Sequence, residues 1–75
     1  QNKEEEFILY TKAAGRICAG MVIPYPPGIP LFVRGEQITT TKLKMLADYL
    51  ASGAMIQGEH DLGNKHLLVL KEEKI

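Results

Sequence analysis

The apolar positions in the first third of the chain predict extended structure broken by one helical turn. Residues 7–10 form an apolar block that predicts a short strand, and residues 11–14 predict a single helical turn with Thr11 as its N-cap. From residue 16 to residue 23, apolar side chains at alternate positions predict a strand. The apolar face of that strand carries Ile17, Ala19, Met21 and Ile23.

Residues 23–30 contain all four prolines of the chain, and this density excludes a helix. A residue that precedes proline is pushed toward an extended conformation. This restriction applies to Ile23, Tyr25, Pro26 and Ile29. Gly28 supplies a position where the chain can turn with a positive φ. We therefore expect a stiff segment that carries apolar side chains.

The clearest helical pattern lies in the second half of the chain, over about residues 40–52. Its apolar stripe consists of Leu43, Leu46, Ala47 and Leu50. Residues 39–41 are threonines that supply N-cap candidates, and Gly53 fits the position after a helix end. This pattern predicts one main helix.

Short apolar blocks on either side of this helix predict further strands. They lie at residues 31–33, 54–57 and 66–70, with a turn at 34–36 and a polar loop at 58–65. Several short strands with one main helix and a rigid proline-rich turn predict a small α+β domain. We expect that domain to span residues 1–75, with residues 1–6 and 71–75 frayed.

The short length of the chain limits its stability. A 75-residue domain buries only about 60% of the surface that its unfolded form exposes. Cys18 is the only cysteine, and His60 and His66 lie six residues apart without a cysteine near them, so neither a disulfide nor a metal site is expected. We therefore expect support from another domain or subunit, including self-association into an oligomer.

Composition excludes several classes of partner. Nine basic and nine acidic residues give a formal charge of zero, which argues against binding to nucleic acid or to an anionic membrane. The apolar runs are far shorter than the roughly 20 residues that span a bilayer. A single cysteine is compatible with a reducing cytoplasm. Because the chain begins with Gln1 and not with methionine, we expect it to be a fragment of a longer protein.

One motif is specific enough to indicate a family. It runs through Tyr25-Pro26-Pro27-Gly28-Ile29-Pro30 inside residues 15–31, and Gly35-Glu36 follows. This stretch resembles the start of the C-terminal domain of the ornithine/lysine/arginine decarboxylases, and a weaker likeness extends over residues 13–70. Two positions depart from the family pattern: Gly20 stands where relatives often have a polar or acidic side chain, and Arg34 stands where many have proline.

The resemblance implies a parent enzyme of fold type I that removes the α-carboxylate of lysine, arginine or ornithine in polyamine metabolism. Such enzymes use pyridoxal phosphate, held on a lysine of the large domain, as an electron sink. This sequence contains neither the motif that leads into that lysine nor a glycine-rich phosphate cradle. We therefore assign no catalytic, cofactor-binding or metal-binding residue to it.

The resemblance also implies a part for this piece of the parent enzyme. In the family, this domain packs against the catalytic domain and helps to shape the entrance to the active site. That role is carried over as a hypothesis to Tyr25, Pro26, Pro27, Gly28 and Glu36.

Plainer interpretations of the same residues stay open. The proline segment is equally well a rigid turn that seats Tyr25, Ile29 and Leu31 in the core. Glu36 could face a cationic substrate or cap a neighbouring backbone amide, and its plainer interpretation is a surface turn residue, because most glutamates are solvated. We expect Arg16 to make an ordinary ion pair. We expect Cys18 to be a small core residue. The three methionines are expected to fill the core; they are Met21, Met45 and Met55.

Two other function classes compete with the accessory domain. Residues 24–30 contain PxxP spacing, which is typical of ligands for aromatic grooves, so the chain could be a protein-interaction module. A free-standing enzyme ranks last because the sequence offers no nucleophile–base pair.

Overall fold

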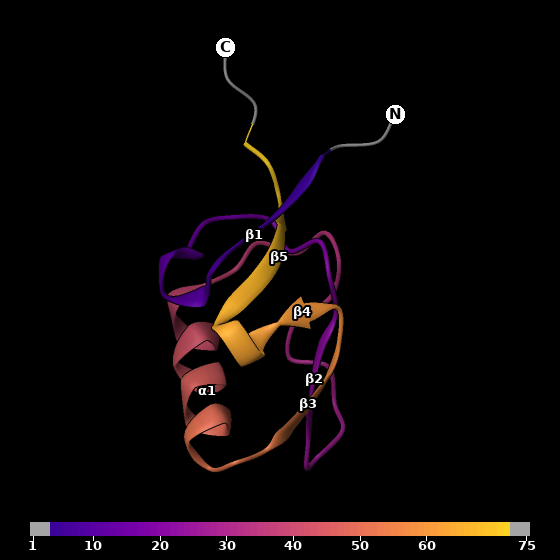
Figure 1. Cartoon of the computed structure of the whole chain (residues 1–75), viewed down its shortest axis with the longest axis vertical. Helices are drawn as coiled ribbons and strands as arrows, with labels where there is room; N and C mark the ends of the chain where they lie inside the picture. Colours follow the sequence, from indigo (N-terminus) through magenta and orange to yellow (C-terminus); the bar gives the residue numbers. More distant parts are fainter. Residues whose placement is uncertain (1–3, 73–75) are drawn as a thin grey trace.

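The described part of the chain folds into five short strands, one α-helix and two short 3-10 helices, which confirms the α+β class (Figure 1). The computed structural model describes residues 4–72. In chain order the elements are β1 (Glu5–Leu9), η1 (Tyr10–Lys12), β2 (Val22–Tyr25), α1 (Thr40–Ala51), β3 (Met55–Gly58), β4 (His60–Asp61), η2 (Leu62–Asn64) and β5 (His66–Leu70).

The strands form two antiparallel sheets. One has the order β1-β5-β4 and the other pairs β2 with β3. Pairing of Glu5 with Leu70 and of Leu9 with His66 aligns the two ends of the described chain side by side. Both termini therefore leave the molecule at the same end (Figure 1).

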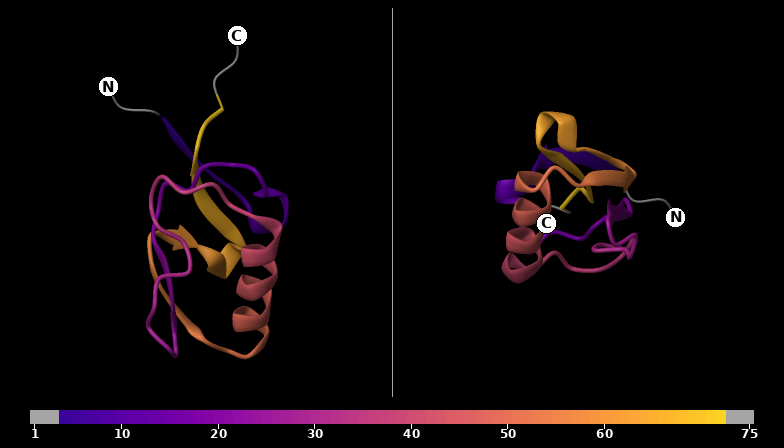
Figure 2. Two further views of the ribbon diagram at one scale, coloured as in Figure 1. Left: turned by 180° about the vertical axis from the view of Figure 1, so that it is seen from behind. Right: turned by 90° about the horizontal axis from the view of Figure 1, so that it is seen from below.

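The core lies between three bodies: α1, the three-stranded sheet and the β2–β3 ribbon (Figure 2). All buried side chains of the described residues are apolar. The core cluster consists of Ala13, Cys18, Val22, Leu31, Phe32, Ile38, Leu43, Leu46, Leu62, Leu67 and Val69. Burial of apolar surface is therefore the main favourable contribution to folding.

The predicted main helix is confirmed. It begins after Thr39, whose side chain accepts a hydrogen bond from the Lys42 backbone N–H at 3.2 Å. This contact satisfies one of the backbone donors that a helix leaves free at its start. Leu43 and Leu46 of the predicted stripe are buried against the core. The helix ends at Ala51, one residue before the predicted end.

The predicted strand over residues 16–23 is wrong in its position and in its buried face. Ile17 makes an isolated bridge to Gln37, and Cys18 makes one to Val69. The segment therefore runs between two different partners, and a continuous strand begins only at Val22. Cys18 and Val22, which have the opposite parity to the predicted face, fill the core, whereas only Ala19 of the predicted face is buried.

Other local predictions are corrected by long-range pairing. Residues 31–33 are not a strand, because only Phe32 bridges to Val22. Residues 58–65, predicted as a loop, contain β4 and η2, since His60 and Asp61 pair with β5. The turn at residues 10–12 has Leu9 at its N-cap without a side-chain hydrogen bond, so the capping role predicted for Thr11 is wrong. The strands predicted at residues 54–57 and 66–70 are confirmed as β3 and β5.

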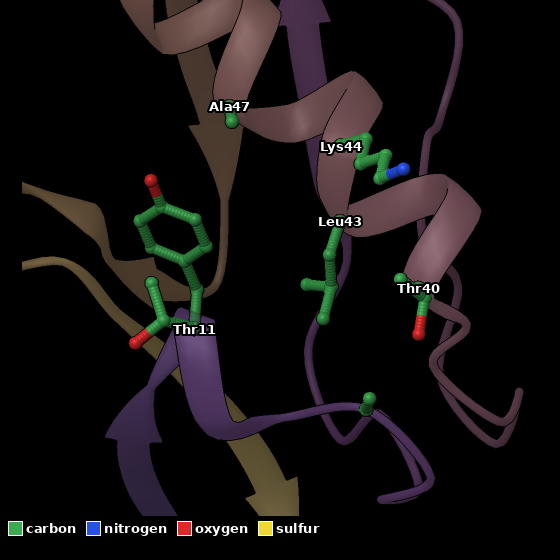
Figure 3. Close-up of a pocket in the computed structure, with 7 residues that line it drawn as sticks. Thr11, Thr40, Leu43, Lys44 and Ala47 are labelled. Atoms are coloured by element: carbon green, nitrogen blue, oxygen red, sulfur yellow. The ribbon is translucent and has the colours of Figure 1, made fainter.

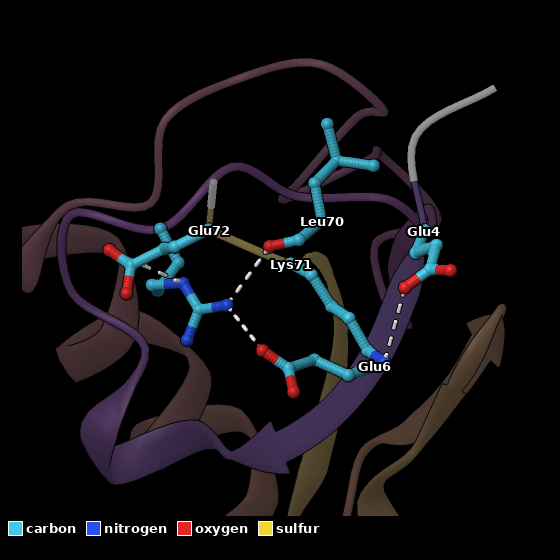
Figure 4. Close-up of polar contacts among 6 residues, drawn as sticks. Glu4, Glu6, Leu70, Lys71 and Glu72 are labelled. Atoms are coloured by element: carbon cyan, nitrogen blue, oxygen red, sulfur yellow. Dashed lines mark hydrogen bonds and ion pairs between the residues drawn. The ribbon is translucent and has the colours of Figure 1, made fainter. Parts of the chain in front are cut away.

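The acidic segment near the start pairs with the end of the described chain. Glu5 and Glu6 belong to β1, and the Glu4 carbonyl accepts a hydrogen bond from the Lys71 N–H at 2.8 Å. Arg16 joins the two ends of the chain, as Figure 4 shows: its Nη2 lies 2.6 Å from Glu6 Oε2 and 2.9 Å from the Leu70 carbonyl. Of the residues predicted to be frayed, Glu5 and Glu6 lie in β1, and residues 1–3 and 73–75 lie outside the described residues.

The outcomes for the sulfur-containing residues differ. Cys18 is buried in the core as predicted, and burial raises the pKa of its thiol. Met45 and Met55 are 43% and 64% exposed, so the prediction that they fill the core is wrong.

Candidate functional site

The proline-rich segment forms a tight turn at the end of β2, which we call the proline tip (residues 25–30). Pro24 is fully buried and anchors it. The Gly28 N–H donates to the Pro24 carbonyl at 2.7 Å, and the Leu31 N–H donates to the Val22 carbonyl at 2.8 Å. These hydrogen bonds return the chain alongside β2, so the tip is held from both of its sides.

The tip carries apolar side chains that are not buried. Tyr25 is 46% exposed and Ile29 is 66% exposed. Tyr25 pairs with Met55 across the ribbon, so the exposed apolar surface continues onto β3. The alternative that seats Tyr25 and Ile29 in the core is therefore wrong for these two residues, although Leu31 is buried. Because side chains alternate along a strand, the burial of Pro24 turns Tyr25 outward.

Gly28 is required at this turn for two reasons. Its φ of +87° lies in the region that side chains disfavour. A Cβ atom on Gly28 would also lie 2.7 Å from Cε1 of Tyr25, because the tyrosine ring covers this glycine. The positive φ predicted for Gly28 is therefore confirmed, and the glycine also fixes the position of the aromatic ring.

Glu36 holds a second turn together. Its Oε1 accepts a hydrogen bond from the Val33 N–H at 2.9 Å, and its Oε2 lies 2.6 Å from Lys42 Nζ. Burial opposes ionisation of this carboxyl, but the contacts with Lys42 and Val33 outweigh burial and lower its pKa. The interpretation of Glu36 as a cap on a backbone amide is therefore confirmed.

The structure brings together four of the five residues assigned to the entrance. Tyr25, Pro26, Pro27 and Gly28 are contiguous in the tip. The Glu36 carbonyl instead accepts from the Cys18 N–H at 2.8 Å. Cys18 precedes β2, whereas the tip follows β2, so Glu36 and the tip lie at opposite ends of this strand.

A polar junction that the sequence did not indicate lies beside the start of β2. Arg34 pairs with Glu59. The Glu59 N–H donates to the Met21 carbonyl at 2.9 Å, and Glu59 Oε1 accepts from the Met21 N–H at 3.3 Å. The hydrogen bond from Arg34 lowers the pKa of the Glu59 carboxyl. Arg34 and Glu59 are 25 residues apart, so no local spacing signals their contact.

Two hollows flank α1, and neither contains a residue of the predicted site. One of about 300 Å³ separates η1 from the first turns of α1 (Figure 3). Lys44 is the only charged side chain that lines it, and that residue is exposed. The other, of about 410 Å³, is lined by Met45, Asp48, Tyr49 and Ser52. Neither hollow gathers the convergent polar groups that mark a catalytic pocket.

The described residues do not fit pyridoxal phosphate. A lysine that forms a Schiff base needs a desolvated position, yet no lysine between residues 4 and 72 is buried. The same part of the chain holds no group of three or more His, Cys, Asp or Glu side chains that could bind a metal. Nor does it contain a helix with the length and apolar character that crossing a membrane requires.

Comparison with known proteins agrees with this fold and motif. Residues 1–60 match the family model described as Orn/Lys/Arg decarboxylase, C-terminal domain. The chain therefore belongs to that family. It is 45% identical over 71 residues to an arginine decarboxylase of Bacillus anthracis, covering 95% of this chain and 14% of that protein. An arginine decarboxylase of Bacillus subtilis is 41% identical over 69 residues, covering 92% of this chain and 14% of that protein.

A solved structure shows the same fold. The constitutive lysine decarboxylase of Escherichia coli superposes with a TM-score of 0.66 and 32% sequence identity. The match covers 91% of this chain and 11% of that chain. This chain thus spans about one seventh of the length of the curated relatives named above.

Proposed function

We propose that this chain is the C-terminal accessory domain of a longer, pyridoxal-phosphate-dependent decarboxylase of basic amino acids in the cytoplasm. In this proposal the domain packs on the catalytic domain, and its proline tip lines the entrance to the active site. Lysine, arginine and ornithine are the candidate substrates, with polyamine metabolism as the setting. The chemistry itself is placed in the parent protein, outside residues 1–75.

The exposed, stiff and apolar proline tip is the observation that carries this proposal. Tyr25 is 46% exposed, whereas Pro24, the residue before it in β2, is fully buried. A rigid tip loses little conformational entropy when another surface covers it. Tyrosine is also suited to such a border, because it presents an apolar ring and a polar hydroxyl.

Glu36 has a narrower part in the proposal. Lys42 already places an ammonium group 2.6 Å from its carboxylate. A cationic substrate would have to compete with this ammonium for the same oxygen atoms. We propose that Glu36 mainly holds the turn at residues 33–36, and that it meets substrate only where Lys42 is displaced.

The proline-ligand alternative has weaker support. PxxP ligands bind as extended polyproline helices. Here the hydrogen bond from Gly28 to Pro24 closes the segment into a turn, and Pro24 is buried. An aromatic groove would therefore have to unfold the end of β2 before it could bind this segment.

We also propose that the parent protein is an oligomer. The domain has one small apolar core and no disulfide, so contact with other surfaces is the remaining source of support.

The entrance proposal is tested by steady-state kinetics on the full-length protein that contains these residues. Tyr25→Ser removes the exposed ring of the tip. We expect decarboxylation of at least one of lysine, arginine and ornithine by the unaltered protein. In the variant we expect a rise in KM of about fivefold with little change in kcat, equivalent to about 1 kcal/mol of lost binding.

The matched control is Met45→Ser, because Met45 is 43% exposed but lies on α1 away from the tip. It should leave KM unchanged. Failure of the unaltered protein to decarboxylate any basic amino acid would refute the class of activity. Equal KM values for Tyr25→Ser and the unaltered protein would refute the entrance role alone.

A further inference from the structure

The centre of the outer face of the β1–β5 ribbon consists of apolar side chains that are partly exposed. Side chains alternate between the two faces of a strand. Leu67 and Val69 of β5 point into the core and are fully buried. The register therefore places Phe7 of β1 opposite Leu68 of β5 on the other face, with Leu9 and Leu70 on that face as well. Glu5 and His66 share this face and lie at its two ends, so its centre is apolar.

The exposure of these side chains is high for apolar residues in a sheet. Phe7 is 51% exposed and Leu9 is 40% exposed. Leu68 and Leu70 are half-buried. Cys18 forms an antiparallel bridge with Val69, so its neighbour Ile17 lies opposite Leu70. The Leu70 N–H donates to the Ile17 carbonyl, and Ile17 adds a further apolar side chain to the same face. Antiparallel sheets normally keep a polar outer face, so this ribbon has the pattern of a sheet covered on both faces.

The edge of the same ribbon is also open. Hydrogen bonds from Tyr10 N–H to the Lys65 carbonyl and from Lys71 N–H to the Glu4 carbonyl set the pairing of β1. The even-numbered residues of β1 therefore bond to β5. The backbone groups of Glu5, Phe7 and Leu9 point away from it, and β1 is the edge of its sheet. Glu5 and Glu6 place charge on the first part of this edge strand, but Phe7 to Leu9 is apolar, and natural proteins seldom leave such an edge without a cover.

We infer that the body of the longer polypeptide covers this ribbon face, which is a second contact surface distinct from the proline tip. This inference rests on the proposed function. Relatives such as the arginine decarboxylase of Bacillus anthracis are about seven times longer than the part this chain matches. A body joined to the chain near β1 meets the ribbon at a high effective concentration, because the linker holds the two together. The proposed occupant is therefore the body of the same polypeptide and not a second copy of this domain.

Hydroxyl-radical footprinting of the full-length protein tests the inference without any variant. Leu9 and Val33 are a matched pair of aliphatic side chains, with exposures of 40% and 42% in the domain alone. Water is excluded from the centre of a protein interface, so we expect Leu9 to be protected about tenfold relative to the denatured protein. The labelling of Val33 should match the labelling expected for a side chain that is as exposed as Val33 is in the domain alone. Phe7 should follow Leu9.

Equal labelling of Leu9 and Val33 would overturn the inference. Protection of Leu9 that disappears when the protein is diluted to monomers would overturn it as well, since a second copy would then be the cover. The footprint does not depend on catalysis. Protection of Leu9 in a protein that decarboxylates no basic amino acid would keep the docking face and reject the proposed function.

Discussion

At the scale of single residues, two glycines allow two backbone segments to come unusually close. A Cβ atom on Gly20 would lie 2.2 Å from the Glu59 carbonyl oxygen, and one on Gly58 would lie 2.0 Å from the Met21 carbonyl oxygen. Neither position can accept a side chain unless the backbone moves. A larger side chain at position 20 is therefore incompatible with the local geometry of this chain.

Gly20→Ala should destabilise the domain by about 1–3 kcal/mol, as overpacking in a tight region does. The control is Gly63→Ala, because no atom lies within 4 Å of a Cβ placed there. A change within about 0.5 kcal/mol is expected for that surface position. Urea unfolding of the 75-residue chain measures both. Equal midpoints for the two variants would show that the two segments can separate without cost.

Glu36 makes the stability of its turn sensitive to acid. Its pKa is lowered from the ordinary 4.5 in the folded chain, so the unfolded chain binds more protons at mildly acidic pH. Stability from this group is therefore fully present above about pH 4.5 and falls as the pH drops through the folded-state pKa. Glu36→Gln should remove this part of the pH dependence. Urea midpoints measured across this range for both proteins would reveal it, and parallel curves would contradict it.

At the scale of elements, β5 organises the fold and α1 forms largely by its own local signals. β5 pairs with β1 on one side and with both β4 and the segment around Cys18 on the other. The start of α1, by contrast, depends on Thr39, whose hydroxyl accepts from the Lys42 N–H. A strand needs distant partners, whereas a helix satisfies its backbone within one segment.

Thr39→Ala should therefore lower stability by about 1 kcal/mol through loss of the N-cap. Thr41→Ala is the matched control, since Thr41 is exposed inside the helix and alanine is a better helix former. Thermal unfolding followed by circular dichroism distinguishes the two. If the melting temperature of Thr39→Ala equalled or exceeded that of Thr41→Ala, the N-cap would contribute nothing to stability.

At the scale of the whole molecule, the two termini and the proline tip occupy opposite ends (Figure 1). A body attached at either terminus can reach the tip only if it lies alongside the domain. The open face of the β1–β5 ribbon begins at the end where the termini leave. The two proposed contact surfaces are thus compatible with a single arrangement in which the rest of the polypeptide lies alongside the domain. The β1–β5 ribbon would contact it near the terminus that joins them, and the proline tip would contact it at the opposite end of the domain.

The sequence by itself determined the features that depend on neighbouring residues. The helical stripe with Thr39 before it predicted α1, and the apolar block at residues 66–70 predicted β5. The proline and glycine chemistry of residues 24–28 predicted a turn with a positive φ at Gly28. The same motif indicated the family, because it is a local string of unusual residues. In each case the conformation follows from local sterics and hydrogen bonding.

Only the tertiary structure decided which partner each segment meets and which face it buries. The strand β4 lies in a polar stretch that forms a strand because β5 lies beside it. Tyr25 and Met55 are apolar yet exposed, since Pro24 takes the inward position. Glu36 meets Lys42, and Arg34 meets Glu59 across 25 residues. Such contacts depend on the path of the whole backbone, and a period of two along a strand cannot tell which of its faces will be inside.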